Sequence, residues 1–362
     1  MSYEMNNILL LGGTGAMGSH LSEILAADKD NEVYVTTRKS RASNQANLRY
    51  LVGNAHDQEF LEDVLAMKQW DAIVDFMAYG TEEFRRKYQI FLQATKQYVF
   101  LSSSRVYAES QSPLTENSPR LIDICEDKDY LATDEYALAK GRQEDFLFNS
   151  ESKNWTIVRP YITFDEYRMQ LSCEEKESWL FRALNGKAIV ISEDLLSKIT
   201  TFTYGVDVAN GIASIICKEK AKGEAFHITC DNTFTWKEIL GFYLDAIHAS
   251  TGIRPEVIIN ANYLPYYGGH LLQVKYDRLY NRIFDNCKIK AFMSGYQFTD
   301  TKSAIFNCIS HFVKYPRWNS INWEQEALID KDTHGFIRWA EICQMRGFKQ
   351  LVKYMINRLG IK

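Results

Sequence analysis

Short apolar runs alternate with helical patterns through the first half of the 362-residue chain. The apolar runs are ILLL at residues 8–11, EVYVTT at 32–37, LRYLV at 48–52, AIVDF at 72–76, YVFL at 98–101 and TIVRP at 156–160. Strands buried on both faces read as continuous apolar runs, and their alternation with helices is typical of a parallel, doubly wound sheet. The pattern therefore predicts an α/β fold.

The alternation becomes irregular after about residue 167. We expect a first domain at residues 1–167, to which 203–230 returns as a helix and a strand, and a smaller mixed α/β substrate-binding and C-terminal region at 168–202 and 231–362. An aromatic run, NYLPYYGGHLL at 262–272, either lines a pocket or packs this smaller region. The basic and apolar run at 348–362 predicts a helix that packs on its own protein, with a membrane-surface helix as the alternative.

Composition excludes several classes of protein. The net charge of −4 gives no electrostatic argument for nucleic acid or an anionic membrane as a partner. The N-terminal run ILLL is too short for a secretion signal, and no stretch approaches the roughly 20 apolar residues of a spanning helix. The seven cysteines form no CxxC pair, so we expect reduced thiols, no metal site and a cytoplasmic protein.

A glycine-rich segment, GGTGAMG at residues 12–18, lies between the first predicted strand and the first predicted helix. Glycine there permits a tight turn and a close approach of the backbone to a pyrophosphate, while the helix N-terminus offers N–H groups to phosphate oxygens. This placement predicts a Rossmann-type dinucleotide-binding turn, although the spacing alone also fits a turn without a ligand. The expected contacts are Gly12, Gly15, Ala16, Met17 and Gly18.

The ends of the following strands suggest how the rest of a dinucleotide would be held. The second strand ends at Thr37 and is followed by Arg38, with no carboxylate for the ribose hydroxyls. A cation suits a 2′-phosphate, so NADP is favoured over NAD, unless Arg38 belongs to a solvated basic loop. Asn54 after the third strand either reaches the adenine or closes a plain turn. We expect Ala78, after the fourth strand, to contact the cofactor as well.

Tyr136 and Lys140 lie one turn apart in YALAK, on a predicted helix at 134–148. An ammonium near a phenol stabilises the phenolate, which can then exchange a proton with a substrate hydroxyl. The serines at 102–104 follow the strand YVFL, where a hydroxyl could hold the substrate oxygen. A surface tyrosine–lysine pair is the alternative, but the glycine turn, the serines and this helix occur in the order that such a site needs.

The chain resembles the extended short-chain dehydrogenase/reductase superfamily, in its branch of NAD(P)-dependent epimerases and dehydratases of nucleotide sugars. The resemblance covers roughly residues 6–240 and depends on GGTGAMG, SSSRVY, YALAK, TIVRP and VDVA. It implies that Tyr136 is the acid/base, that Lys140 is its partner, and that Ser103 binds the substrate oxygen, with Ser104 as the fallback. It also implies that residues at and just after Pro160 pass near the nicotinamide, and that the protein is a homodimer.

Some positions depart from the family pattern. Ser104 and Arg105 stand where sugar 4,6-dehydratases carry an aspartate and a glutamate, so dehydration by that mechanism is not expected. Ile162 and Thr200 stand where many members carry an asparagine and an arginine that contact the substrate, so a differently held nucleotide or a non-nucleotide substrate stays open.

We therefore expect an NAD(P)-dependent epimerase of a nucleotide-activated sugar, acting by transient oxidation of a sugar carbon, with surface polysaccharide assembly as its context. The first alternative is an NADPH-dependent keto-sugar reductase, which Arg38 favours. The second is a non-catalytic dinucleotide-binding or RNA-associated scaffold, which the complete set of Ser103, Tyr136 and Lys140 disfavours.

Overall fold

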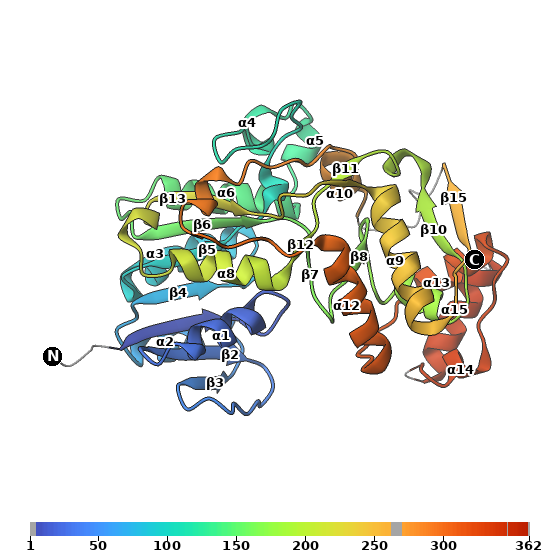
Figure 1. Ribbon diagram of the computed structural model, residues 1–362, viewed down its shortest axis with the longest axis horizontal. Helices are drawn as coiled ribbons and strands as arrows, with labels where there is room; N and C mark the ends of the chain where they lie inside the picture. The colour runs from blue at the N-terminus through green and yellow to red at the C-terminus, as the bar shows by residue number, and fades with distance from the viewer. Residues whose placement is uncertain (1–4, 262–269, 346, 361–362) are drawn as a thin grey trace. The chain divides into compact units, whose positions relative to one another are not determined.

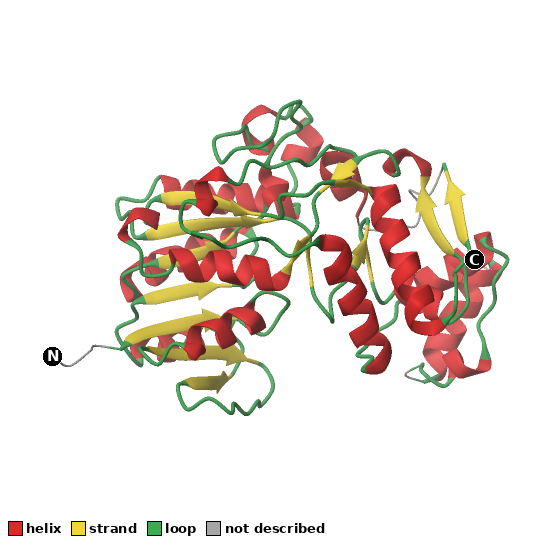
Figure 2. Ribbon diagram, viewed as in Figure 1, coloured by secondary structure: helices red, strands yellow, loops and turns green. Residues whose placement is uncertain are grey.

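The computed structural model describes residues 5–261, 270–345 and 347–360, and the chain divides into two compact units. The first unit comprises Met1–Asp165, Thr201–Thr233 and Arg282–Thr301. The second comprises Glu166–Thr200, Phe234–Asn281 and Lys302–Lys362. Figure 1 labels the elements of both units, and Figure 2 shows the same view coloured by secondary structure.

A seven-stranded sheet forms the centre of the first unit, and every neighbouring pair of its strands is parallel. Its order is β13-β6-β5-β4-β1-β2-β3. The strands are β1 (Asn6–Leu11), β2 (Asn31–Thr37), β3 (Leu48–Val52), β4 (Ala72–Asp75), β5 (Tyr98–Leu101), β6 (Trp155–Pro160) and β13 (Glu224–Ile228). The α/β prediction is confirmed, because all six apolar runs of the first half are strands of this one sheet.

Helices cover both faces of the sheet (Figure 1). Alternate residues of β1 point to opposite faces, so that Ile8 belongs to one apolar core and Leu9 to the other. The first core contains residues of α1 (Gly18–Ala27), α8 (Gly205–Ile215) and α11 (Cys287–Lys290). The second contains residues of α2 (Gln58–Ala66), α3 (Thr81–Ala94) and α6 (Tyr136–Phe148). Burial on both faces is the physical reason for the continuous apolar runs.

The strand order reverses at β1, which lies between β2 and β4. In open parallel sheets a ligand binds outside the carboxyl ends of the strands at such a reversal. Here β1 runs directly into the glycine-rich segment and α1. The topology therefore places residues 12–18 at the position where a doubly wound sheet binds its ligand.

A late segment of the chain also belongs to the first unit. Residues 282–301, which the sequence pattern grouped with the C-terminal region, contact the end of β13. The Asn286 side-chain amide donates a 2.8 Å hydrogen bond to the carbonyl oxygen of Thr229, and Leu114 forms an isolated bridge with Phe284. Two short parallel strands, β7 (Thr163–Phe164) and β12 (Thr203–Tyr204), complete this part of the unit.

Over its described residues, the second unit consists mainly of helices, together with three two-stranded sheets. Its helices and strands are β8 (Gln170–Leu171), β9 (Glu174–Glu175), α7 (Trp179–Leu184), β10 (Ile189–Ser192), β11 (Ile199–Thr200), β14 (Phe234–Thr235), α9 (Trp236–Thr251), β15 (Val257–Asn260), α10 (Leu271–Gln273), α12 (Thr301–Lys314), α13 (Trp323–Asp332), α14 (Trp339–Ile342) and α15 (Phe348–Leu359). Buried ion pairs join α7 to α13, because Arg182 binds Glu326 at 2.8 Å and Asp330 at 2.9 Å.

Most of the aromatic run at 262–272 lies outside the described residues. Within the described part of the chain, none of the helices has the length and apolar character needed to cross a membrane.

Candidate functional site

The glycine-rich turn joins β1 to α1, and close packing leaves no room for a Cβ atom at Gly12, Gly13 or Gly18. Gly12 has a φ of +67°, and a Cβ atom there would lie 2.7 Å from the Sδ atom of Met77. A Cβ atom on Gly18 would lie 2.6 Å from the Cα atom of Gly13. Around Gly15, by contrast, no atom of the described residues lies within 4 Å of the added Cβ position, apart from those of Gly15 and its two chain neighbours. Gly12 and Gly18 therefore allow the turn to form, whereas Gly15 borders open space that a ligand can fill.

The environment of this turn fits a dinucleotide pyrophosphate. The first turn of α1 contains no acidic residue, and its N-cap, Met17, supplies no capping side chain. The positive end of the helix dipole is thus left for an anionic group. The Gly12 N–H donates a 2.8 Å hydrogen bond to Oγ1 of the buried Thr36 in β2. Thr36 thereby fixes the start of the turn, a role that the sequence did not suggest.

Three further residues expected to hold a cofactor are exposed just after the carboxyl ends of their strands. Arg38 follows β2, Asn54 follows β3, and Ala78 follows β4. Asn54 uses its side-chain oxygen to accept a 3.2 Å hydrogen bond from the His56 backbone N–H, as in the plain turn that was the alternative for this position. Pro160, the last residue of β6, is buried.

The three serines after β5 have different partners. Ser102 donates a 2.6 Å hydrogen bond to Glu144, and Ser104 donates a 2.7 Å hydrogen bond to the carbonyl oxygen of Arg159. Ser103 instead accepts a 3.2 Å hydrogen bond from the backbone N–H of Arg105, which leaves its hydroxyl hydrogen for another acceptor. Ser103 is therefore better suited to bind a substrate oxygen, whereas Ser104, the predicted fallback, is fully buried and bound to the backbone.

Tyr136 and Lys140 lie on the same side of α6, as the spacing predicted. Tyr136 is the first residue of the helix and is 41% exposed, whereas Lys140 is 2% exposed. The Lys140 Nζ atom lies 6.0 Å from the centroid of the Tyr136 ring and donates a 2.8 Å hydrogen bond to the carbonyl oxygen of Leu101. The ammonium is thus held between the end of β5 and a phenol that solvent can reach.

Burial lowers the pKa of Lys140 to about 8, although the charges of Asp75 and Glu144 act in the opposite direction. A lysine with this pKa keeps its charge at neutral pH and loses it under mildly alkaline conditions. The positive charge is therefore sensitive to both carboxylates, which are fully buried.

Asp75 is a residue that sequence reasoning missed. It ends β4 with no exposed surface, and it accepts hydrogen bonds from Tyr98 at 2.7 Å and from the backbone N–H of Met77 at 2.9 Å. Burial raises the pKa of Asp75, and these donors together with Lys140 oppose that shift. Because Met77 also packs against Gly12, Asp75 connects the glycine-rich turn with the surroundings of Lys140.

Arg105 is the second missed residue. Its guanidinium carbon lies 5.2 Å from the centroid of the Tyr136 ring, and it forms an ion pair with Glu135. Glu135 also accepts hydrogen bonds from Tyr130 at 3.1 Å and from the Ala137 N–H at 2.8 Å, and it is the N-cap of α6. Tyr136 therefore has two neighbouring cations, Lys140 and Arg105, and the Arg105 charge is shared with Glu135.

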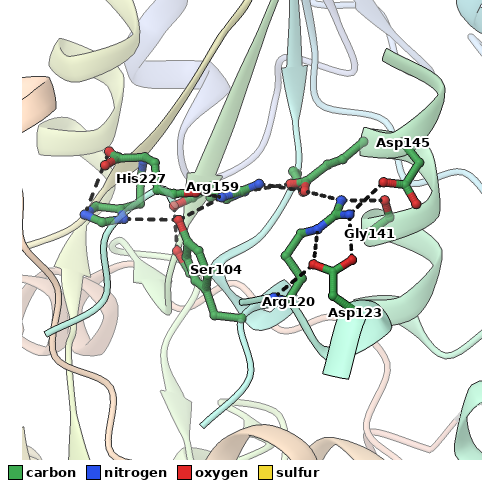
Figure 3. Close-up of polar contacts among 11 residues, drawn as sticks. Ser104, Arg120, Asp123, Gly141, Asp145, Arg159 and His227 are labelled. Carbon is green, nitrogen blue, oxygen red and sulfur yellow. Dashed lines mark hydrogen bonds and ion pairs between the residues drawn. The ribbon is translucent and has the colours of Figure 1, made fainter. Parts of the chain in front are cut away.

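A largely buried ionic network that includes Arg159 and Arg120 adjoins Ser104 (Figure 3). Arg159 of β6 binds Glu144 of α6 through two 2.8 Å contacts, and Arg120 binds the same carboxylate at 3.3 Å. Arg159 also donates a 2.9 Å hydrogen bond to the hydroxyl of Tyr107. Since Glu144 receives the Ser102 hydrogen bond, the network fixes the ends of β5 and β6 to the helix that carries Tyr136 and Lys140.

The parallel sheet with its glycine-rich turn and a tyrosine–lysine helix defines a Rossmann-like α/β protein of the short-chain dehydrogenase/reductase type. The family model described as NAD dependent epimerase/dehydratase family matches residues 8–229. The match covers more than half of the chain, and the chain belongs to this family. None of the curated proteins compared with the sequence matches it.

Several solved structures have a similar fold. They include a dTDP-glucose 4,6-dehydratase from Bacillus anthracis in complex with NAD, with a TM-score of 0.66, 16% identity, and coverage of 86% of this chain and 98% of that chain. A UDP-glucose 4-epimerase from Bifidobacterium longum in complex with NAD+ and UDP has a TM-score of 0.63 and 17% identity, with 86% and 99% of the two chains covered. The WbmH enzyme of Bordetella bronchiseptica in complex with NAD+ has a TM-score of 0.65 and 16% identity, with 86% and 100% covered. At these sequence identities the comparisons show a similar fold and do not show a shared reaction.

Proposed function

We propose that the protein is an NAD(P)-dependent epimerase of a nucleotide-activated sugar, which oxidises a sugar carbon transiently and reduces it again. The observation that carries the proposal is the grouping of Ser103, Tyr136 and Lys140 around the end of β5, in the unit that holds the glycine-rich turn. The family membership and the NAD bound by several similar structures support it.

The chain's own groups suit the proton transfers of this reaction. Tyr136, as phenolate, takes the proton from a sugar hydroxyl, and Lys140 and Arg105 stabilise the negative charge before the transfer. Ser103 donates its hydroxyl hydrogen to the same sugar oxygen and keeps it in place. The bound dinucleotide would supply hydride acceptance and return, with its pyrophosphate held by the turn at Gly12, Gly15 and Gly18. On the reverse step Tyr136 returns the proton.

A keto-sugar reductase that uses NADPH is the second candidate. The exposed Arg38 after β2 favours it, because a guanidinium can bind a 2′-phosphate and because no carboxylate stands at the end of that strand. In this reaction Tyr136 would donate a proton to the oxygen of a ketone, so the same residues serve both candidates.

The proposal includes a homodimer and a role in surface polysaccharide assembly in the cytoplasm, as in the family that the chain resembles. The helices expected at the dimer interface are α3 and α6, which lie on the same face of the sheet. Size-exclusion chromatography with light scattering measures the molar mass in solution. A mass equal to that of one chain contradicts the proposed dimer.

The reaction is tested by incubating the protein with a panel of nucleotide sugars and with either NAD+ or NADPH. Mass spectrometry and NMR of the products distinguish the candidates, because epimerisation changes no mass and reduction adds two hydrogens. An epimer formed in the presence of NAD+ supports the first candidate. A reduced sugar with consumption of NADPH supports the second, and dinucleotide binding without turnover of any sugar contradicts both.

A further inference from the structure

The C-terminal helix α15 has an apolar outer face. Its exposed apolar side chains lie three or four residues apart, so that they form one stripe along the helix. They are Phe348, Val352, Ile356 and Leu359, with exposed fractions of 76%, 39%, 42% and 55%. We call these four residues the α15 stripe. A stripe of this kind is normally buried in a soluble domain, and it therefore requires an explanation.

The opposite face of the same helix is the one that packs on the protein. Tyr354 is fully buried, and its hydroxyl donates a 2.7 Å hydrogen bond to Asp330 of α13. Arg358 donates a 3.0 Å hydrogen bond to the carbonyl oxygen of Gly335. The helix is thus attached through Tyr354 and Arg358, and through Lys353, which binds Glu324 of α13 at 2.6 Å. None of the four stripe residues takes part in these polar contacts. The predicted packing of the helix on its own protein accounts for one face only.

The charge of this region differs from that of the whole chain. From residue 342 to residue 362 the sequence contains five basic residues and no acidic one, whereas the chain as a whole has a net charge of −4. Within α15, Lys349 and Lys353 are exposed, and they follow Phe348 and Val352 directly in the sequence. Lys353 also forms a 2.6 Å ion pair with the exposed Glu324 of α13, so Lys349 is the cation of this edge with the fewer acidic neighbours. At 100° per residue both lysines lie along one edge of the stripe. A stripe of apolar side chains bordered by lysines is typical of helices that lie in a lipid–water interface.

We propose that the α15 stripe docks on the surface of a membrane that carries anionic lipid headgroups. The four apolar side chains enter the boundary between headgroups and acyl chains, and Lys349 and Lys353 lie at the level of the lipid phosphates. The helix lies parallel to the membrane plane and does not span it. This inference concerns the second unit alone and does not depend on the reaction catalysed.

A second copy of the chain is a less suitable partner for this face. In a two-fold contact the same stripe meets itself, and when the two helices are antiparallel the lysine-bearing edges of both copies lie on the same side of the contact. The repulsion between these like charges opposes such a contact, whereas anionic headgroups attract the same lysines. The charges thus favour a lipid surface.

The test is co-sedimentation of the full chain with vesicles. We expect binding to vesicles that contain phosphatidylglycerol, at least tenfold weaker binding to pure phosphatidylcholine, and a decrease in binding as the salt concentration rises. The double variant Val352→Glu/Ile356→Glu should lose at least tenfold in affinity for the anionic vesicles. Lys349→Gln/Lys353→Gln should reduce the preference for anionic over neutral vesicles.

The matched control is Ile253→Glu/Ile259→Glu, whose side chains are 38% and 55% exposed in the same unit. It adds the same charges outside α15 and should bind vesicles like the wild type. Thermal unfolding confirms that each variant is folded. The proposal is wrong if wild type does not sediment with anionic vesicles, or if both double glutamate variants lose equal affinity. It is also wrong if Val352→Glu/Ile356→Glu only converts a dimer to a monomer in sedimentation analysis.

Discussion

The Lys140 ammonium donates a 2.8 Å hydrogen bond to the carbonyl oxygen of Leu101, the last residue of β5. The bond fixes a buried cation at the carboxyl end of the sheet, directly before the serines at 102–104. Its charge then acts on Tyr136, one helical turn away on α6. The contact joins the strand that positions Ser103 to the helix that positions Tyr136, which is why these groups are expected to act as one unit.

The pH dependence of turnover should reflect this buried lysine. The pKa of Lys140 is lowered to about 8 by burial, and Asp75 opposes the shift, so kcat should fall as the pH rises through about 8. Asp75→Asn removes a negative charge that raises the pKa of Lys140, so the alkaline limb should move to lower pH. A full profile of kcat against pH measures the shift. The control is Asp71→Asn, directly before β4, which should leave the alkaline fall of kcat at the same pH. If Asp75→Asn also leaves that fall at the same pH, then Asp75 does not act on Lys140.

Two glycines of the turn should respond differently to the same substitution. Gly18→Ala places a Cβ atom 2.6 Å from the Cα atom of Gly13, so we expect a loss of about 1–3 kcal/mol in the free energy of unfolding. Gly15→Ala meets no protein atom within 4 Å, so stability should change by no more than about 0.5 kcal/mol. Dinucleotide binding, measured by calorimetry, should nevertheless weaken about tenfold or more in Gly15→Ala. Unchanged binding in that variant would place the pyrophosphate elsewhere.

Cofactor choice should depend on Arg38. A charge-assisted hydrogen bond contributes about 1.5–3 kcal/mol, so Arg38→Ser should raise the Kd of NADPH by roughly 10- to 100-fold and leave that of NADH nearly unchanged. Arg86→Ser, an exposed arginine on α3, provides the matched control. If both dinucleotides bind to Arg38→Ser as they do to wild type, then Arg38 belongs to a solvated loop and the preference for NADP is lost.

Removing one partner of the buried Arg159–Glu144 pair should strongly destabilise the protein. Arg159 and Glu144 are 1% and 0% exposed, and Glu144→Gln leaves the guanidinium of Arg159 without its carboxylate partner. Breaking a buried pair in this way costs about 3–5 kcal/mol of unfolding free energy, which urea titration can measure. The exposed Glu151→Gln should cost almost nothing. A loss below about 1 kcal/mol for Glu144→Gln would mean that the network contributes little.

The sequence predicted the sheet because burial on both faces leaves a continuous apolar run in each strand. The run AIVDF shows the limit of this prediction, because the pattern identifies Asp75 only as part of a strand. Its role depends on Tyr98 in β5 and on Lys140 in α6, and no local pattern joins these residues.

The choice among the three serines likewise depends on tertiary contacts. Ser102, Ser103 and Ser104 are chemically identical in the sequence, and only their partners, Glu144, the Arg105 N–H and the Arg159 carbonyl, distinguish them. The grouping of residues 282–301 with the first unit follows from contacts such as that between Asn286 and Thr229, which lie 57 positions apart in the chain.

The central claim is that the Tyr136 phenol exchanges a proton with a substrate beside a bound dinucleotide. The most direct measurement compares turnover and dinucleotide affinity in Tyr136→Phe, with Tyr315→Phe, a 62% exposed tyrosine of the second unit, as the control. We predict that Tyr136→Phe loses about 10²- to 10⁴-fold in kcat and binds the dinucleotide like the wild type, while Tyr315→Phe changes neither. Wild-type turnover in Tyr136→Phe would contradict the account.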